Sequence, residues 1–342
     1  RYTETAIAAF HRYIPALTSD EQEEAVRRAE KVALRVGITT VGTLLDTSDQ
    51  MGAYFRLHRR RELRLRVVGM PPWTSVEALH ANGVGTGFGD DQLRFGGAKL
   101  FADGSFGART ALLSSPYSDH PDTTNLGIRI YTSEELTGRV VEADRKGFQI
   151  VIHAIGDQAL REAIGAIETA LENRPNVLRH RIEHVSLAPA DLRERMAGSG
   201  ILAVVQPQFV TSDTWTGERL GPDRSADAYP FRALRDGGVR LGLSSDCPVE
   251  RLDPFALLAA AVWRDAWSPQ GGLTLDDALE DYTMGSAYAL GIENAVGSLE
   301  TGKWADYVVL DCSPWDLSES EFKEMTVSET FVAGVSRERQ GS

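Results

Sequence analysis

The sequence predicts an α/β fold in which helices cover a parallel sheet, specifically a (β/α)8 TIM-type barrel that lacks strand one. Short apolar runs alternate with amphipathic helices along most of the chain. Nothing between these runs resembles the tight turn that joins two antiparallel strands. Repeated units of this kind predict parallel strands with helices packed on their outer face.

Seven apolar runs have the length and composition of buried strands. In chain order they are ITTVGTLL (38–45), LRLRVVGM (63–70), LRFGGAKLF (93–101), FQIVIH (148–153), LRHRIEH (178–184), ILAVVQP (201–207) and VRLGLSSD (239–246). A barrel of this class needs eight strands. We therefore expect the chain to begin after strand one, unless an eighth strand escapes the count.

A doubly wound open sheet is the competing architecture. That fold usually shows a Gly-rich phosphate turn after its first strand, and the run at 38–45 does not supply one. The glycines of GVGTGFGD (83–90) have no strand before them and no helix after them, so we interpret the segment as a loop. The barrel is therefore favoured.

The helices between the strands have recognisable ends. The first is capped by Thr18 or Ser19, carries acids in its first turn and stops at Gly37. A long polar loop is predicted from Ala102 to about Thr132. Helices are predicted in MGAYFRLHRRRE (51–62), SEELTGRVVEADRKG (133–147), DQALREAIGAIETALENR (157–174), APADLRERMAGSG (188–200) and FRALRDGG (231–238).

The pattern changes after about residue 290. The segment GSLETGKWADYVVLD (297–311) is rich in turns and holds one alternating strand, and ETFVAGVSR (329–337) predicts another. Two strands are too few for a domain. We expect residues 1–290 to form the barrel and residues 291–342 to belong to a small β-structure whose other strands lie elsewhere.

Composition excludes several classes of function. The net charge of −13 argues against binding to nucleic acid, which needs clustered Lys and Arg. No apolar run reaches the length of a membrane span, so no membrane partner is expected. The two cysteines give no disulfide framework, which is typical of a reducing compartment, and a cytoplasmic location is expected. Unpaired strand edges invite association, so a homo-oligomer is an open alternative.

Four reactive side chains stand at the ends of predicted strands: Lys99, His153, His184 and Asp246. Taken singly, each has an ordinary explanation. Lys99 could reach to solvent, His153 could be a core residue, His184 could pair with Glu183, and Asp246 could cap a helix. In a barrel, however, these strand ends converge on the face where active sites lie.

Two imidazoles and a carboxylate suit a divalent metal, with zinc the favoured ion. Lys99 could join them if its amine reacts with CO2 to form a carbamate, which behaves like a carboxylate. Asp246 would then serve both as ligand and as catalytic proton acceptor. If His153 is a ligand, Asp157 or a backbone carbonyl is expected to hold its second ring nitrogen.

Loops next to these strand ends offer candidates for a substrate pocket. Asp103, Ser105 and Arg109 follow the third predicted strand, and Trp215 and Tyr229 follow the sixth. The alternative is that these loops only cover the mouth of the barrel.

The sequence also resembles the amidohydrolase superfamily, in its amidohydrolase-3, N-substituted formamide deformylase-like branch. The matching segments are KLFADGSFGARTALLSSPYSD (99–119), IHAIGDQAL (152–160), RIEHVSL (181–187), LGLSSDCPV (241–249) and GSLETGKWADYVVLD (297–311). The resemblance implies a barrel with a small β-sandwich. It also implies Lys99, His153 and His184 as ligands from strands four, five and six, and Asp246 as the acid and base of strand eight.

The function implied is metal-dependent hydrolysis of an amide or related C–N bond in a small-molecule substrate. Ester or lactone hydrolysis at the same site is one alternative, and a metal-free binding or regulatory barrel is another. The family carries an H-x-H pair on strand one, and none of the seven histidines forms such a pair. The resemblance thus implies a chain that begins after strand one, with one or two metal ions in the full-length enzyme and an incomplete, inactive site as an alternative here.

Overall fold

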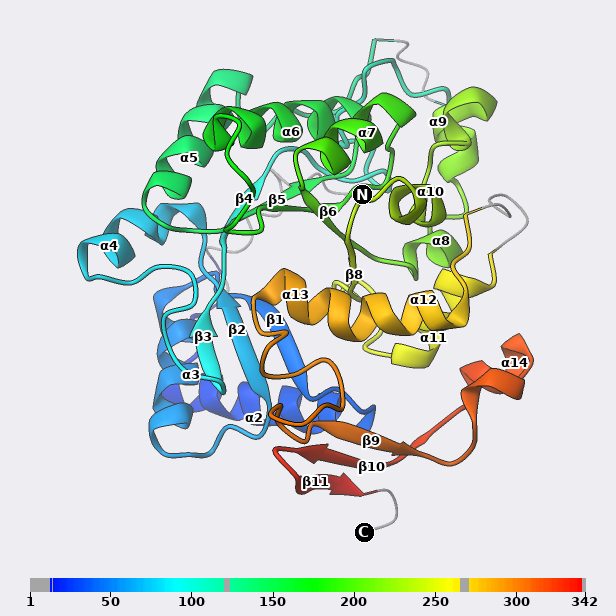
Figure 1. Cartoon of the computed structure of the whole chain (residues 1–342). Helices are drawn as coiled ribbons and strands as arrows, with labels where there is room; N and C mark the ends of the chain where they lie inside the picture. Colours follow the sequence, from blue (N-terminus) through cyan, green and yellow to red (C-terminus); the bar gives the residue numbers. More distant parts are fainter. Residues whose placement is uncertain (1–12, 14, 120–123, 265–270, 340–342) are drawn as a thin grey trace.

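Parallel strands form the centre of the molecule (Figure 1). The structure is a computed structural model that describes residues 13, 15–119, 124–264 and 271–339. A five-stranded parallel sheet has the order β4-β5-β6-β7-β8, and a three-stranded parallel sheet has the order β1-β2-β3. The bounds are β1 Thr40–Leu44, β2 Arg66–Met70, β3 Leu93–Phe95, β4 Ala98–Phe101, β5 Ile150–Ala154, β6 Arg181–His184, β7 Leu202–Val205 and β8 Leu241–Leu243. Each predicted strand is present.

The two parallel sheets meet at the start of β4. Pro72 pairs with Lys99 in a parallel bridge, and the Lys99 amide donates a hydrogen bond to the Pro71 carbonyl, 2.9 Å. The run 93–101, predicted as one strand, is split into β3 and β4 at a glycine pair. A Cβ on Gly97 would lie 2.6 Å from a methyl group of Val151, so only glycine allows this close approach.

The strands do not close into a ring within the described ranges, where no ladder joins β1 to β8. The segment that follows β8 lies beside both edges. In α13 (Ser286–Leu290), the Ser286 hydroxyl bonds the amide and the carbonyl of Leu243, each at 3.1 Å. Leu290, at the other end of α13, packs against Gly42 of β1. This helix therefore bridges the two edge strands (Figure 1).

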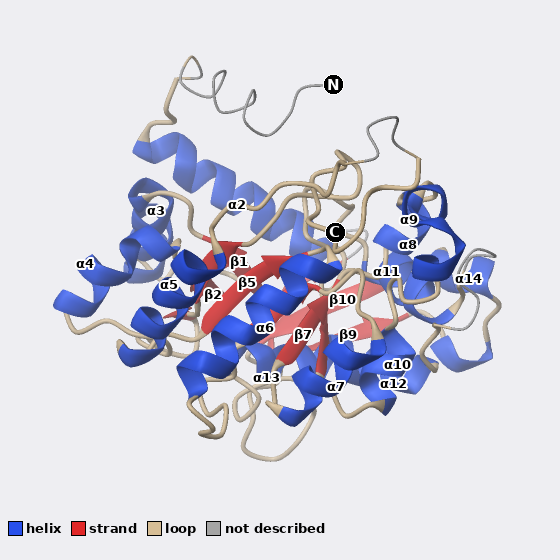
Figure 2. Cartoon of the chain, turned by 90° about the horizontal axis from the view of Figure 1, so that it is seen from above, coloured by secondary structure: helices blue, strands red, loops and turns tan. Residues whose placement is uncertain are grey.

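Helices surround the parallel strands, as the view in Figure 2 shows. The main core lies between the five-stranded sheet and helices α5, α6 and α7, and includes Ile150 and Ile152, both fully buried. The helices are α2 Ser19–Arg35, α3 Ser48–Arg59, α4 Val76–Ala81, α5 Ser133–Arg145, α6 Asp157–Leu171, α7 Ala190–Gly198, α8 Phe209–Ser212, α9 Thr216–Ser225, α10 Phe231–Asp236, α11 Pro254–Val262, α12 Leu275–Glu280, α13 and α14 Glu319–Lys323. Short turns are η1 Trp73–Ser75, the π-helical η2 Asp281–Gly285 and η3 Pro314–Asp316.

The ends of α2 agree with the sequence signals. Thr18 is the N-cap and forms a capping box with Glu21, which satisfies amide groups that the first turn leaves free. Gly37 follows the helix with a φ of 86°, a conformation that glycine adopts without strain. None of the described helices is both long and apolar enough to cross a bilayer.

A small antiparallel sheet follows the parallel strands in the chain, with the order β11-β10-β9. Its strands are β9 Tyr307–Leu310, β10 Val327–Val332 and β11 Val335–Arg339. The segment 329–337, predicted as one strand, is instead a hairpin. Ala333 and Gly334 both have positive φ, 53° and 72°, which turns the chain back after Val332.

The buried carboxyl of Asp281, the first residue of η2, is expected to make the stability of the folded protein depend on pH. Its side chain is 3% exposed, and burial raises the pKa of the carboxyl to about 7, although Arg235 bonds it and opposes the shift. The folded protein therefore binds this proton more tightly than the unfolded chain does. The stability that this bound proton contributes is fully present at pH values below the ordinary pKa of an Asp carboxyl. It is lost as the pH rises through about 7.

Asp281→Asn removes this titration, because an amide carries no charge at any of these pH values. Melting temperatures between pH 4 and pH 8 should fall more steeply in the wild-type protein than in the variant. Arg235 keeps Asp277 and Glu280 as partners, so it is not left unpaired. Parallel curves for the two proteins would contradict the assignment.

Candidate functional site

The structure brings the four predicted site residues to the carboxyl ends of strands in the same parallel sheet. Lys99 lies in β4 and His153 in β5, His184 ends β6, and Asp246 follows β8. The ring centroids of His153 and His184 are 4.4 Å apart. Burial raises the pKa of the Asp246 carboxyl, and the Lys99 ammonium opposes that shift.

His153 is held through one ring nitrogen. Its Nε2 lies 2.9 Å from the Gly104 carbonyl oxygen and 3.4 Å from Oδ1 of Asp103. A carbonyl oxygen only accepts, so Nε2 carries a hydrogen, and in the neutral tautomer Nδ1 is then the nitrogen with the free lone pair. A backbone carbonyl thus plays the part expected for the second nitrogen. Asp157, the other candidate, is engaged by the amide and hydroxyl of Ser114.

His184 has the properties that a neutral ligand requires. Burial first, and then His153 and Lys99, hold its pKa well below the usual histidine value, so the ring is neutral at neutral pH. Its Nδ1 is buried and has no hydrogen-bond partner among the described residues. The backbone of His184 is in the left-handed region, with φ 79°, a costly conformation for a residue with a side chain.

The charged groups of Lys99 and Asp246 also have no ion-pair partner among the described residues. Lys99 is 9% exposed, and burial lowers its pKa although Glu183 and Asp246 oppose the shift. Asp246 is exposed at the rim, yet the protein around its carboxyl raises its pKa against the effect of Lys99. Within the described ranges, neither side chain forms an ion pair, and the Asp246 carboxylate accepts no hydrogen bond.

The two imidazoles are close to each other, but the four candidate side chains are not arranged as a finished coordination sphere. Among the described residues, no three His, Cys, Asp or Glu side chains form a group that could hold a metal ion. The orphaned Nδ1 of His184 and the mixed nitrogen and oxygen donors nevertheless fit a divalent metal.

Asp103 and Ser105 are occupied by the loop that contains them. The buried Asp103 carboxylate accepts from three backbone amides, those of Leu112, Ile155 and Gly156, at 2.8–3.0 Å. The Ser105 hydroxyl accepts from the Ala108 amide at 3.3 Å. These bonds join the loop after β4 to the start of α6. A role for either residue in substrate binding stays a prediction.

The other three pocket candidates pack along the same loops. Arg109 forms a two-bond pair with Asp119, at 2.6 and 3.1 Å. The Trp215 ring lies under the Arg219 guanidinium, 4.8 Å away, and next to Gly107. Tyr229 is 2% exposed and donates to Asp213 at 2.7 Å. Their contact with substrate also stays a prediction.

Three neighbours of the site were not identified from the sequence. Phe101 lies two residues after Lys99 and therefore on the same face of β4, a signal that strand alternation offers. Phe209 stacks on the His184 ring, with centroids 5.9 Å apart. Glu183 receives a hydrogen bond from the buried Arg181 at 2.8 Å. No sequence signal predicted these last two contacts.

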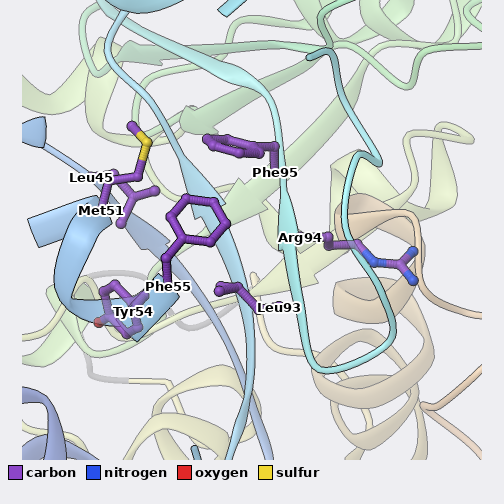
Figure 3. Close-up of a pocket in the computed structure, with 7 residues that line it drawn as sticks. All are labelled: Leu45, Met51, Tyr54, Phe55, Leu93, Arg94 and Phe95. Atoms are coloured by element: carbon purple, nitrogen blue, oxygen red, sulfur yellow. The ribbon is translucent and has the colours of Figure 1, made fainter. Parts of the chain in front are cut away.

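A small apolar cavity lies elsewhere, between α3 and the strands β1 and β3 (Figure 3). None of the four candidate site residues lines it. Its walls are Leu45, Met51, Tyr54, Phe55, Leu93, Arg94 and Phe95. We assign no chemistry to this cavity.

Comparison with known proteins gives consistent matches. Residues 2–337 match the amidohydrolase family model. The chain is 33% identical to Protein LONG AFTER FAR-RED 3 of Arabidopsis thaliana, over 94% of this chain and 58% of that protein. It is 34% identical to the Bacillus subtilis protein YtcJ, named as an amidohydrolase, over 71% and 47%. It is 32% identical to the N-substituted formamide deformylase of Arthrobacter pascens, over 73% and 47%. The chain thus spans about half the length of these relatives.

Two solved structures of metal-dependent hydrolases are also similar to this chain. An uncharacterized metal-dependent hydrolase from Pyrococcus furiosus is 34% identical, with a TM-score of 0.81, over 88% of this chain and 62% of that one. A second, from Pyrococcus horikoshii, is 35% identical, with a TM-score of 0.82, over 89% and 62%.

Proposed function

The chain belongs to the amidohydrolase family, in its amidohydrolase-3 branch, and from this premise we propose that it forms most of the active site of a metal-dependent hydrolase. The substrate is a small molecule, and the bond cleaved is an amide or related C–N bond. The observation that carries the proposal is the meeting of Lys99, His153, His184 and Asp246 at one rim, with a ring nitrogen of His184 left unpaired.

The barrel is part of the same proposal. Strands β1, β2 and β4–β8 would supply seven parallel members of a TIM-type barrel, and among the described residues no ladder joins β1 to β8. Residues 291–342 belong with a small β-sandwich, supported by the antiparallel β9–β11. Likeness to the Aspergillus niger ochratoxinase structure, at 19% identity and a TM-score of 0.64, supports the fold alone.

Lys99, His153, His184 and Asp246 would hold the metal, with zinc the favoured ion. A bound divalent cation would supply Lewis-acid activation of water and of the amide carbonyl. Lys99 would bind as a carbamate, since burial lowers the pKa of its amine and leaves more of the neutral form that reacts with CO2. That reaction forms an N–C bond and releases one proton from the amine.

Asp246 has the properties of the proton carrier. Its carboxylate has no hydrogen-bond or ion-pair partner among the described residues. Its pKa is raised towards neutral pH, and a group with such a pKa both accepts and returns a proton efficiently. We propose that it takes a proton from the attacking water and gives it to the departing amine. Gly104 fixes the His153 ring, and Phe209 packs on His184, so both imidazoles keep their orientation.

The proposal is tested by amine release from N-alkylformamides, a class suggested by the name of the Arthrobacter pascens relative. The protein that carries this chain is assayed as purified, after chelation and after Zn²⁺ is added back. We expect hydrolysis that chelation abolishes and zinc restores. Cleavage of matched alkyl formates without cleavage of the formamides would favour the ester alternative. A protein that binds no metal and cleaves neither class would contradict an enzymatic role.

A further inference from the structure

We propose that Phe101 forms the wall of a subsite for an apolar group next to the scissile bond, so that the substrate is an amide with an apolar substituent. The inference rests on the proposed function and deepens it by naming a substrate class. It concerns a residue outside the ligand set.

Phe101 lies on the same face as the candidate ligands. It is the last residue of β4, two positions after Lys99, and side chains two apart on a strand share a face. The Lys99 Nζ lies 4.9 Å from the centroid of its ring. The sheet register pairs Phe101 with His153, and their ring centroids are 5.4 Å apart. The ring is therefore next to two of the four candidate residues.

Four rings form a continuous row across the site. Phe101 contacts His153, His153 contacts His184, and His184 stacks on Phe209, over centroid distances of 5.4, 4.4 and 5.9 Å. The two ends of the row differ. Phe209 is 8% exposed and packs in the core, whereas Phe101 is 41% exposed. The accessible apolar surface of this row is thus concentrated at Phe101.

An exposed phenyl ring beside a lysine and a histidine is an unusual element of a polar rim. Burying apolar surface is favourable in proportion to its area, so a ligand group that covers this ring gains binding energy. A small polar amide would leave the ring in water. Because the ring borders the candidate catalytic groups, the covered group must sit close to the bond that is cleaved.

Other exposed rings provide matched controls. Phe55 is 40% exposed, and its ring lies 5.6 Å from that of Phe95, on the side of the molecule shown in Figure 3. It is thus as accessible as Phe101, but within the described residues its ring does not contact Lys99 or His153. Replacing Phe55 removes a comparable apolar area away from the site.

Phe101 could instead act only on Lys99, by holding the ammonium over its ring face. The two roles differ in how the effect of substitution depends on substrate. If Phe101 only positions Lys99, its substitution changes kcat/KM for every substrate equally. A subsite wall affects substrates in proportion to the size of their apolar group.

The experiment compares the wild-type protein with Phe101→Ala, Phe101→Leu and Phe55→Ala, using N-methyl-, N-butyl- and N-hexylformamide. We expect the wild-type kcat/KM to rise with chain length. Phe101→Ala should lose about tenfold or more with the hexyl compound and little with the methyl compound, since each methylene in an apolar subsite is worth about tenfold or more in discrimination. Phe101→Leu should recover part of the loss, and Phe55→Ala should match the wild type. Unchanged melting temperatures exclude misfolding.

Equal losses on all three formamides would overturn the inference and show that Phe101 acts only by positioning Lys99. Wild-type rates in Phe101→Ala would also overturn the inference. If the wild-type protein cleaves none of them, the proposed function fails, and titration calorimetry with N-methyl- and N-hexylformamide decides the inference. Length-dependent binding that Phe101→Ala weakens would support the subsite. Binding that is absent or independent of length would overturn it.

Discussion

Asp246→Asn is expected to lower kcat/KM on an N-alkylformamide by about 10³-fold, within the range that general acid–base catalysis contributes. The amide cannot accept the proton of the attacking water, and it cannot return one to the departing amine. Asp246 lies at the rim, and its carboxylate accepts no hydrogen bond from the described residues, so the fold should remain. Steady-state kinetics together with the melting temperature measure both effects.

Glu250→Gln is the matched control, because it removes a carboxylate from the same loop after β8. We expect it to keep most of the activity. If Asp246→Asn retains wild-type turnover, or if both variants lose activity equally, Asp246 is not the proton carrier.

Asp306→Ala should destabilise the protein by about 3–5 kcal/mol, the usual cost of breaking a buried ion pair. Arg66 at the start of β2 donates to both oxygens of Asp306, at 2.7 and 3.0 Å, and the Ala333 amide donates at 2.7 Å. The two charged side chains are 7% and 3% exposed. The substitution would leave the Arg66 guanidinium buried without its counter-charge, and it would free the hairpin of the small sheet. Denaturant unfolding measures the change.

The control for Asp306 is an exposed ion pair of similar length. Arg161 and Asp191 are 2.8 Å apart, with side chains 41% and 55% exposed. Asp191→Ala should cost no more than about 1 kcal/mol, because water screens such pairs. If Asp306→Ala lowers the free energy of unfolding by no more than Asp191→Ala does, the pair with Arg66 does not stabilise the packing of the antiparallel sheet against β2.

Most of the parallel strands could be predicted because they are buried and therefore appear as largely apolar runs, as in the segment that holds Ile150 and Ile152. Positions at the ends of these runs then indicated Lys99, His153, His184 and Asp246. The hairpin at Ala333 and Gly334 was missed because alanine hides a turn that Asn or Asp would have marked. The split at Gly96 and Gly97 depends on the close approach of β5, which no local pattern contains.

Contacts within the site depend on loop paths, and these could not be predicted. The bond from His153 to Gly104 requires the loop after β4 to fold back over β5, where Asp103 ties it to backbone amides of the next unit. The stacking of Phe209 on His184 likewise depends on how the chain turns after β7. Phe101 is different, since its place two residues after Lys99 follows from the geometry of a strand.

The central claim is that these strand ends hold a divalent metal, and metal content tests it most directly. The protein that carries this chain is dialysed with Zn²⁺, freed of excess ion and measured by elemental analysis, alongside His153→Asn, His184→Asn and His58→Asn. His58 is a control because it pairs with Asp90, 3.0 Å away, outside the candidate site. We predict bound zinc in the wild type and in His58→Asn, and loss of most of it in the other two variants with little change in melting temperature. Full zinc content in both His153→Asn and His184→Asn, with lowered melting temperatures, would show that these histidines are structural and would contradict the account.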